Sequence, residues 1–413
     1  MIGVQPNACS PRISSRNRQT EGDAVKRATG LLAVGGVLVL AGCSGGGTSG
    51  ADHSDAVASP KVSTARLAIE PKDGSQGAAP NALKVSVASG KLTSVAVTDK
   101  SGKPVDGTIS ADGASWSPSA GLAVGAAYQV SARAADADGV VTTANSAFTT
   151  LTPEQTLKVS DNVDTGEKYG VGMIVSVRFG DQVKNRAEAQ KAITVEATDG
   201  TVVKGHWFED GTRLDLRPEN YWKPDTTVKV HFRTKNVELS PGVYGDTDRD
   251  EQFTIGRSKV SAVDASSHMM VVKEDGRSDQ NVPITAGAND NPSWNGTMVI
   301  SAKSRMEHMA SSTVSDIKGP GYSVDEPHAL RLTNSGTYVH GNPKAGAVAG
   351  RENISHGCIG LPDSAQGDDG STAGRFYADS LIGDVVTVKN SVKTQALNPD
   401  NGLSGWNMAW SKW

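Results

Sequence analysis

The chain has 413 residues, of which 21% are charged, and a formal net charge of −4 at pH 7. This length suits about two to four domains rather than one, since single hydrophobic cores stop growing at about 250–300 residues. The small net charge, without a long basic run, excludes a surface built to neutralise a phosphate backbone, so nucleic acid is not an expected partner.

The N-terminal region has the layout of a secretory signal peptide. Its apolar run, residues 31–41, follows a segment with several Arg and Lys residues. The run is short for a membrane span of about 20 residues, so a permanent transmembrane helix is the weaker interpretation. It ends in Leu40-Ala41-Gly42-Cys43, which resembles a bacterial lipobox, although plain signal cleavage with an incidental Cys is the alternative. Residues 1–43 are predicted to be a lipoprotein signal whose Cys43 carries lipid.

Only three cysteines occur in the chain. Cys9 would be lost with the signal and Cys43 would be capped by lipid, which leaves Cys358 alone. An exported protein with one free thiol has no disulfide framework, so that thiol needs another explanation.

Two segments with strand patterns follow a polar linker. Residues 44–61 are rich in Gly, Ser, Ala and Asp and predict a flexible tether. Residues 62–152 alternate apolar and polar side chains between turn signals, and residues 153–256 repeat the theme. Alternation with period two and frequent turns predicts a small β-sandwich for each segment.

Strand patterns continue beyond residue 256, but the loops become longer and more polar, and function tends to lie on such loops. The chain closes with Trp406, Trp410 and Trp413, which would share one face if the tail were helical. We expect this tail to dock on the neighbouring domain and bury its rings, rather than to form a sugar-binding platform.

The chemistry is concentrated in two stretches, residues 338–343 with His340 and residues 353–361 with His356 and Cys358. A thiol becomes a useful nucleophile when a neighbouring imidazole takes its proton. In a strand His356 and Cys358 would share a face, whereas in a turn Gly357 would permit unusual backbone angles and leave amides free for an oxyanion. A buried structural Cys358 and a zinc site are the alternatives, although a tight zinc site usually adds a further ligand.

This pattern resembles the catalytic motif of the L,D-transpeptidases, in which a His is followed along the chain by Ser-His-Gly-Cys. Gly321-Tyr322, Ser335-Gly336 and residues 383–386 also stand where that family has similar residues. The Trp-rich end resembles the tail of actinobacterial and mycobacterial members. The resemblance implies a mainly β protein, in which immunoglobulin-like β-sandwich domains at 62–152 and 153–256 precede a β-rich catalytic domain at 257–390 and a docked tail at 391–413.

By the same resemblance Cys358 is the nucleophile, His340 its general base and His356 a supporting residue. The amides of Gly357 and Cys358 would form the oxyanion hole. Tyr322, which could add to that hole, and Met309 would belong to a lid over the substrate. The remaining residues expected at the substrate site are Ser355, Gly341 and Asn353.

Two residues depart from the family pattern. Gly341 replaces a Ser whose backbone carbonyl orients the base, which Gly still supplies, and Gly360 replaces an Asn or Arg whose side chain helps to hold the site. His308 and His328 match no role and are expected on the surface of the lid.

The resemblance implies a peptidoglycan L,D-transpeptidase that forms 3-3 cross-links through a Cys358 thioester and releases D-Ala. Its partners would be stem tetrapeptides as donor and acceptor, and carbapenems would acylate the thiol; no cofactor or metal is expected. The alternatives are a carboxypeptidase or protein-to-peptidoglycan ligase of the same family, or a degenerate wall-binding protein without catalysis. The expected location is the cell envelope, at the outer face of the plasma membrane through the lipid anchor, or otherwise the cell wall after secretion.

Overall fold

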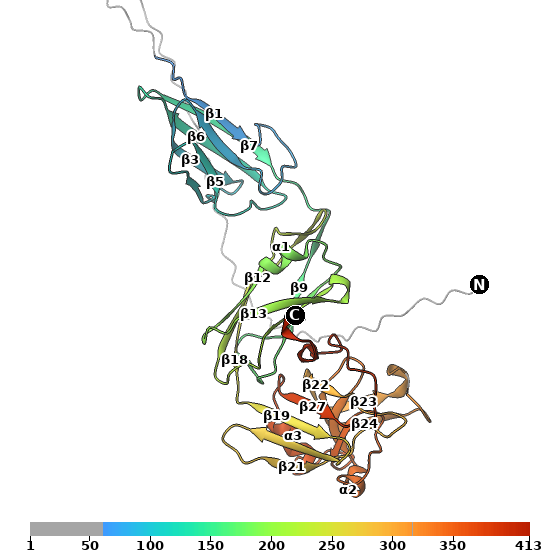
Figure 1. Cartoon of the computed structure of the whole chain (residues 1–413). Helices are drawn as coiled ribbons and strands as arrows, with labels where there is room; N and C mark the ends of the chain where they lie inside the picture. Colours follow the sequence, from blue (N-terminus) through green and yellow to red (C-terminus); the bar gives the residue numbers. More distant parts are fainter. Residues whose placement is uncertain (1–60, 316) are drawn as a thin grey trace, which may run out of the picture. The chain divides into compact units, whose positions relative to one another are not determined.

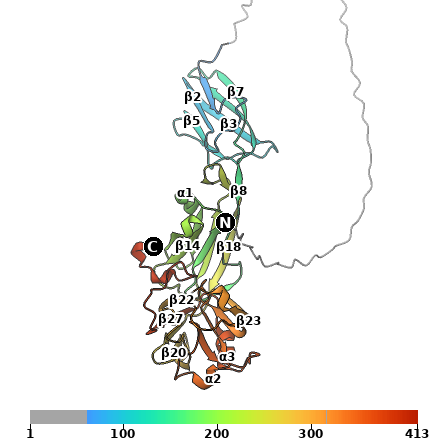
Figure 2. The same cartoon turned by 90° about the vertical axis from the view of Figure 1, so that its right-hand side faces the viewer.

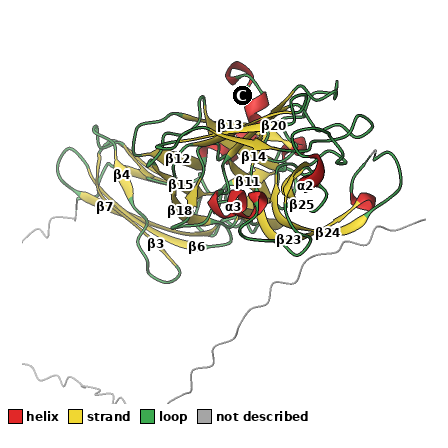
Figure 3. Ribbon diagram, turned by 90° about the horizontal axis from the view of Figure 1, so that it is seen from below, coloured by secondary structure: helices red, strands yellow, loops and turns green. Residues whose placement is uncertain are grey.

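The computed structural model describes residues 61–315 and 317–413. Residues 61–413 form one compact unit, which is mainly β as the sequence predicts, with few and short helices (Figure 3). The predicted signal peptide, the lipobox with Cys43 and the linker up to Pro60 lie outside the described residues. Within the described part, no helix has both the length and the apolar character needed to cross a membrane.

The first module consists of two sheets around one core, with strand orders β1-β2-β5-β4 and β3-β6-β7 (Figure 1). The alternation of apolar and polar residues explains this core. In β6, every second side chain is buried and those between are exposed; the buried ones are Tyr128, Val130, Ala132 and Ala134. The strands are β1 (Arg66–Glu70), β2 (Lys84–Ala88), β3 (Lys91–Asp99), β4 (Gly107–Ile109), β5 (Ser115–Pro118), β6 (Ala127–Ala135) and β7 (Val141–Thr149).

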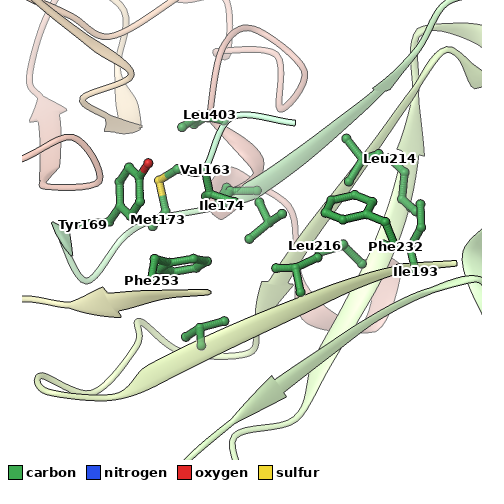
Figure 4. Close-up of a cluster of buried hydrophobic side chains, with 14 of the residues drawn as sticks. Val163, Tyr169, Met173, Ile174, Ile193, Leu214, Leu216, Phe232, Phe253 and Leu403 are labelled. Carbon is green, nitrogen blue, oxygen red and sulfur yellow. The ribbon is translucent and has the colours of Figure 1, made fainter. Parts of the chain in front are cut away.

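The second module repeats this two-sheet arrangement, with orders β10-β18-β15-β12 and β13-β14-β11-β9, and adds the small sheet β16-β17-β8. Val228, Val230 and Phe232 of β15 alternate into its core, and Figure 4 shows Phe232 there among other buried side chains. Its elements are β8 (Gln155–Leu157), β9 (Val159–Ser160), β10 (Lys168–Tyr169), β11 (Val175–Phe179), α1 (Arg186–Lys191), β12 (Ile193–Ala197), β13 (Val203–Phe208), η1 (Glu209–Gly211), β14 (Arg213–Pro218), β15 (Thr227–Arg233), β16 (Glu238–Ser240), β17 (Val243–Gly245) and β18 (Asp248–Ile255).

The third part has two sheets, β21-β20-β19-β27-β22 and β23-β24-β25-β26, together with short helices (Figure 2). β19 and β27 are parallel neighbours although they are far apart in the sequence. The elements are β19 (Lys259–Asp264), β20 (Met269–Glu274), β21 (Gln280–Pro283), β22 (Gly296–Val299), β23 (Ala302–Ala310), η2 (Ser311–Thr313), β24 (Ser323–Arg331), β25 (Tyr338–Asn342), α2 (Ala345–Val348), β26 (Ile359–Pro362), α3 (Thr372–Asp379), β27 (Val385–Lys389), η3 (Gly405–Asn407) and η4 (Trp410–Lys412).

The core of the second module continues into the third part. Val299 of β22, Val385 of β27 and Leu403 belong to the same buried cluster as Phe232, and Figure 4 draws Leu403 among the side chains of this cluster. The backbones also approach closely, because the Gly172 N–H donates a hydrogen bond to the carbonyl oxygen of Gly383 at 2.8 Å. The two parts therefore share one continuous apolar interior rather than meeting across a wet interface.

The C-terminal tail does not form a regular helix, since η3 and η4 are single 3-10 turns. It contacts the second module as well as the third part. Trp406 and Trp413 donate their indole N–H groups to the carbonyls of Gly172 and Lys204, at 2.8 and 3.0 Å, while Asn407 exchanges hydrogen bonds with the backbone of β22. The red C-terminus accordingly lies beside the green strands in Figures 1 and 2. The tail thus ties the second module to the third part.

Candidate active site

The thiol and the imidazole singled out by the motif lie on neighbouring strands. β25 and β26 pair in parallel, with Val339 opposite Ile359 and His340 opposite Gly360. Cys358 directly precedes β26, and a parallel register places residues of equal position side by side. Residues that the sequence separates by a loop and helix α2 are thereby brought together at one edge of the pair.

His340 is held in one orientation. Its ring is 5% exposed, and Nδ1 donates a hydrogen bond to the carbonyl oxygen of Gly341 at 2.8 Å. This bond selects the tautomer with hydrogen on Nδ1, which leaves Nε2 to accept the proton of the thiol. Cys358 is half-buried, with Sγ 3.6 Å from the carbonyl oxygen of Gly336. The pair has the geometry of a thiol beside its base.

The charges around the imidazole favour its protonated form. Burial alone lowers the pKa of His340, but the hydrogen bond with Cys358 and the contact with Glu326 outweigh it and raise the pKa to about 10. At neutral pH this favours a protonated imidazole beside the sulfur of Cys358. The thiolate is the form of cysteine that attacks a carbonyl.

The turn before the nucleophile depends on one glycine and one serine. Gly357 has a φ of +115°, which L side chains rarely adopt, and Ser355 Oγ donates to the carbonyl oxygen of Cys358 at 2.6 Å. The Gly357 amide, expected to face an oxyanion, instead donates to Ser355 Oγ at 3.1 Å, because the serine closes the turn. The amide of Cys358 has no hydrogen-bond partner among the described residues. It is the backbone donor available to an oxyanion here.

The hairpin of β23 and β24 covers the thiol with an apolar cluster. Met309 and Tyr338 form this cluster with Ala329, and Tyr322 and Cys358 pack against it. A cavity of about 110 Å³ is lined here by Met309, Tyr322, Gly336 and Tyr338, among others. Burial, together with the charges of Cys358 and Glu326, raises the pKa of Tyr322, so its hydroxyl keeps its proton. A protonated hydroxyl at this position can donate to a developing negative charge.

The remaining predicted residues lie in two different environments. His356 is exposed, and its ring stands 4.9 Å from the ring of Tyr322. Asn353 is engaged in structure: its amide accepts from the Ala286 N–H and donates to the Ala265 carbonyl, both at 2.8 Å. These bonds hold the loop before Ser355 and leave little of the Asn353 amide for a substrate.

A larger cavity of about 570 Å³ lies elsewhere, between α3 and the β20–β21 edge. It contains neither Cys358 nor His340. Its charged side chains pair with each other, as Lys259 does with Asp379 at 3.2 Å. Cys358 packs against the cluster of Met309 and Tyr338, and both of these residues line the smaller cavity, which therefore lies next to the candidate site.

Comparison with known proteins identifies the families to which two parts of the chain are similar. Residues 75–238 match the bacterial Ig domain family, and residues 258–388 match the L,D-transpeptidase catalytic domain family. L,D-transpeptidase 2 of Mycobacterium tuberculosis is 30% identical over 352 residues, which is 84% of each chain. The chain belongs to the L,D-transpeptidase family. The resemblance of the sequence motif is thereby confirmed, as is the mainly β fold with an Ig-like region and a β-rich catalytic domain.

Other L,D-transpeptidases show the same relationship. L,D-transpeptidase 5 of Mycobacterium tuberculosis is 29% identical, and the match covers 99% of this chain and 89% of that protein. Among solved structures, an LD transpeptidase in complex with imipenem is 26% identical, with 56% of this chain and 97% of that chain covered and a TM-score of 0.47. An L,D-transpeptidase from Mycobacterium smegmatis is 26% identical over 57% of this chain and 99% of that chain, with a TM-score of 0.45.

Packing explains both glycines by which this L,D-transpeptidase departs from the motif of its family. A Cβ at Gly341 would overlap Asp363 Oδ2 and lie 2.8 Å from Asp363 Cβ. A Cβ at Gly360 would lie 2.9 Å from a methyl group of Thr285 and 3.2 Å from Asn342 Cβ. Neighbouring side chains thus occupy the space that a larger residue would need.

We expect Gly341→Ser, which restores the residue common in the family, to destabilise this protein by about 1–3 kcal/mol. The new side chain must displace Asp363 from its buried hydrogen bond with His328. Thermal unfolding monitored by circular dichroism measures the effect. Gly346→Ser is the matched control, because a Cβ at Gly346 meets nothing within 4 Å. Equal midpoints for the two variants would contradict the steric explanation.

Sequence reasoning missed two acidic residues beside the site. The Glu326 carboxylate lies 3.5 Å from His340, and Asp363 bonds His328 Nδ1 at 2.6 Å. The prediction that His328 lies on the lid surface is wrong, since its side chain is fully buried and its φ of +51° is left-handed. Glu326 and Asp363 belong to no recognisable sequence motif. Only strand pairing brings them next to the two histidines, so no local pattern could have indicated them.

Proposed function

We propose that this L,D-transpeptidase forms 3-3 cross-links between peptidoglycan stem peptides through a thioester on Cys358. One observation carries the proposal: Cys358 stands beside a buried His340 whose Nδ1–H is bonded to the Gly341 carbonyl, under a lid that carries Tyr322. A thiol that is activated by an oriented imidazole can act as the nucleophile in acyl transfer.

In the first half-reaction, His340 takes the proton of Cys358 and the thiolate attacks the carbonyl carbon of the third residue of a donor tetrapeptide. The C–S bond forms and the carbonyl oxygen becomes an oxyanion, toward which the Cys358 amide and the Tyr322 hydroxyl would donate. The C–N bond to D-Ala then breaks. The imidazolium of His340 gives its proton to the leaving nitrogen, which leaves a thioester on the enzyme.

In the second half-reaction, the side-chain amine of the third residue of an acceptor stem attacks the thioester carbonyl. A new amide bond forms, the C–S bond breaks, and the proton of the amine returns to the thiol through His340. Water in place of the amine would make the protein a carboxypeptidase, and an amine on a protein would make it a ligase. The three activities thus share the thioester and differ in the acceptor.

The raised pKa of His340 predicts how the first half-reaction depends on pH. An imidazole whose pKa is about 10 keeps its proton below that pH and loses it above. We therefore expect single-turnover release of D-Ala to be retained from neutral pH to about 10, and to fall at higher pH because the leaving nitrogen no longer receives a proton. Rapid-quench assay of free D-Ala measures this. A fall already near pH 7 would contradict the assignment of His340.

The proposed reaction is tested by incubating soluble protein that begins at Lys61 with purified disaccharide-tetrapeptide. Mass spectrometry should detect a dimer formed with loss of D-Ala. Protein first treated with iodoacetamide, which blocks the thiol, is the control and should form none. Tripeptide without dimer would establish a carboxypeptidase instead. Wall binding without any product would establish a binding protein.

The surroundings of the reaction follow from the same proposal. Lipid on Cys43 would anchor the enzyme at the outer face of the plasma membrane, and residues 62–152 and 153–256 would act as spacers that carry the catalytic domain into the wall. The solved relative in complex with imipenem supports carbapenems as inhibitors, which would acylate Cys358 here. Labelling with a fatty-acid probe, lost on Cys43→Ser, tests the anchor.

A further inference from the structure

Glu326 is a buried carboxylate beside the imidazole that the motif does not include. It lies on β24, its side chain is 17% exposed, and Oε2 stands 3.5 Å from Nδ1 of His340. Oε2 has no hydrogen-bond partner among the described residues. An unpaired buried carboxylate oxygen is unfavourable unless a positive charge lies next to it.

The contact between Glu326 and His340 is an ion pair rather than a hydrogen bond. The hydrogen on Nδ1 is already donated to the Gly341 carbonyl, which is closer, at 2.8 Å. The Gly341 carbonyl therefore sets the orientation of the His340 ring, and the Glu326 carboxylate contributes a negative charge next to it. A negative charge at this distance stabilises the imidazolium and does nothing comparable for the neutral ring.

Other ionisable groups surround this corner. Glu307 of β23 is the cross-strand neighbour of Glu326, but its Oε1 accepts a hydrogen bond from the Tyr338 hydroxyl at 3.1 Å. The negative charge of Glu326 also helps to raise the pKa of Tyr322. The titratable groups facing the pair are Tyr322 from the lid, Tyr338 from β25, Cys358 before β26, Glu307 from β23 and Arg331, whose charge acts on Tyr338.

We propose that Glu326 is a positioning residue that keeps His340 protonated as the partner of the Cys358 thiolate. This inference rests on the proposed function of the pair, and adds a third, charged member to it. The neutral pair and the ion pair differ only in the place of one proton, so a fixed negative charge beside the imidazole moves that proton from sulfur to nitrogen. The upward shift of the pKa of His340, to which Glu326 contributes after Cys358, has the same direction.

The test measures how fast iodoacetamide alkylates Cys358 in the full chain between pH 6 and pH 11. Mass spectrometry of the peptide that carries Cys358 reports the alkylation of this thiol alone. We expect the wild type to react at a rate that is high and nearly constant around neutral pH. Glu326→Gln should lower the rate at pH 7 by about tenfold, because removal of an adjacent charge returns the proton to sulfur.

The shape of this pH dependence separates positioning from packing. Above about pH 10 the imidazole is neutral in both proteins, so the rates of Glu326→Gln and the wild type should converge. Glu326→Asp should recover part of the neutral rate. Glu307→Gln, which removes the same charge from the facing strand, should leave the neutral rate within about twofold of the wild type.

Three results would overturn the inference: an unchanged profile in Glu326→Gln, an equal loss at every pH, or the same loss in Glu307→Gln. Failure of the proposed function is a separate result. It would appear as wild-type protein that forms no dimer from tetrapeptide, whatever the alkylation profile, because alkylation requires no stem peptide.

Discussion

Replacement of Cys358 by Ala should lower kcat for dimer formation by at least about 10⁴-fold, since no other group can form the acyl intermediate. The Cys358 thiol packs against the lid cluster and lies beside His340, whereas alanine offers neither nucleophile nor proton. The measurement is the rate of dimer formation from disaccharide-tetrapeptide, followed by chromatography. Covalent modification by imipenem, followed by intact mass, should be lost in the same variant.

The control for this prediction is affinity for wall material. Cys358 is half-buried and small, so its truncation should change the unfolding midpoint little and leave binding to purified peptidoglycan unchanged. Dimer formation that persists in Cys358→Ala would exclude the thioester route. If Cys358→Ala lost both wall binding and the folded state, its inactivity would reflect instability and not the missing thiol. Cys358→Ser, which is closer to Cys in volume, would then replace it in the assay.

Replacement of Arg217 by Met should lower the free energy of unfolding by about 2–4 kcal/mol. The Arg217 guanidinium lies 4.7, 5.4 and 4.2 Å from the ring centres of Trp406, Trp410 and Trp413, and it donates to the carbonyl of Met408 at 2.8 Å. Burial lowers the pKa of Arg217 to about 10, and its Nε has no hydrogen-bond partner among the residues that the structure describes, so part of the gain from these contacts is offset by desolvation. The residue nevertheless joins the tail to β14.

The expected shift in the midpoint of thermal unfolding for Arg217→Met is roughly 5–10 °C downward. Limited proteolysis should also release the tail from this variant first. Lys204→Met is the matched control, because Lys204 is exposed and its ammonium lies 4.6 Å from the centre of one ring, that of Trp410. That variant should shift the midpoint by less than about 2 °C. Equal shifts in the two variants would show that the contact of Arg217 with three Trp rings does not stabilise the fold more than a single exposed cation–ring contact does.

Much of this protein is readable from local patterns. The strand of Val228, Val230 and Phe232 agrees with the β-sandwich predicted for residues 153–256, because alternation with period two is a property of neighbouring residues. The Ser355–Cys358 half of the motif is likewise short and contiguous, and the comparisons confirm the family that the motif indicated. The Trp spacing of the tail left its conformation open, and the structure shows two 3-10 turns whose rings contact Arg217 and the carbonyls of the second module.

The sequence by itself determined the strand-rich modules and the pairing of a lone thiol with a histidine, because alternation and short motifs are encoded within a few residues. Only the tertiary structure decided the environment of that pair. Glu326 reaches His340, and Asp363 fills the space beside Gly341, through strand pairing between segments that carry no common pattern. The physical reason is that a charge contact depends on distance in space, which the register of β24, β25 and β26 sets.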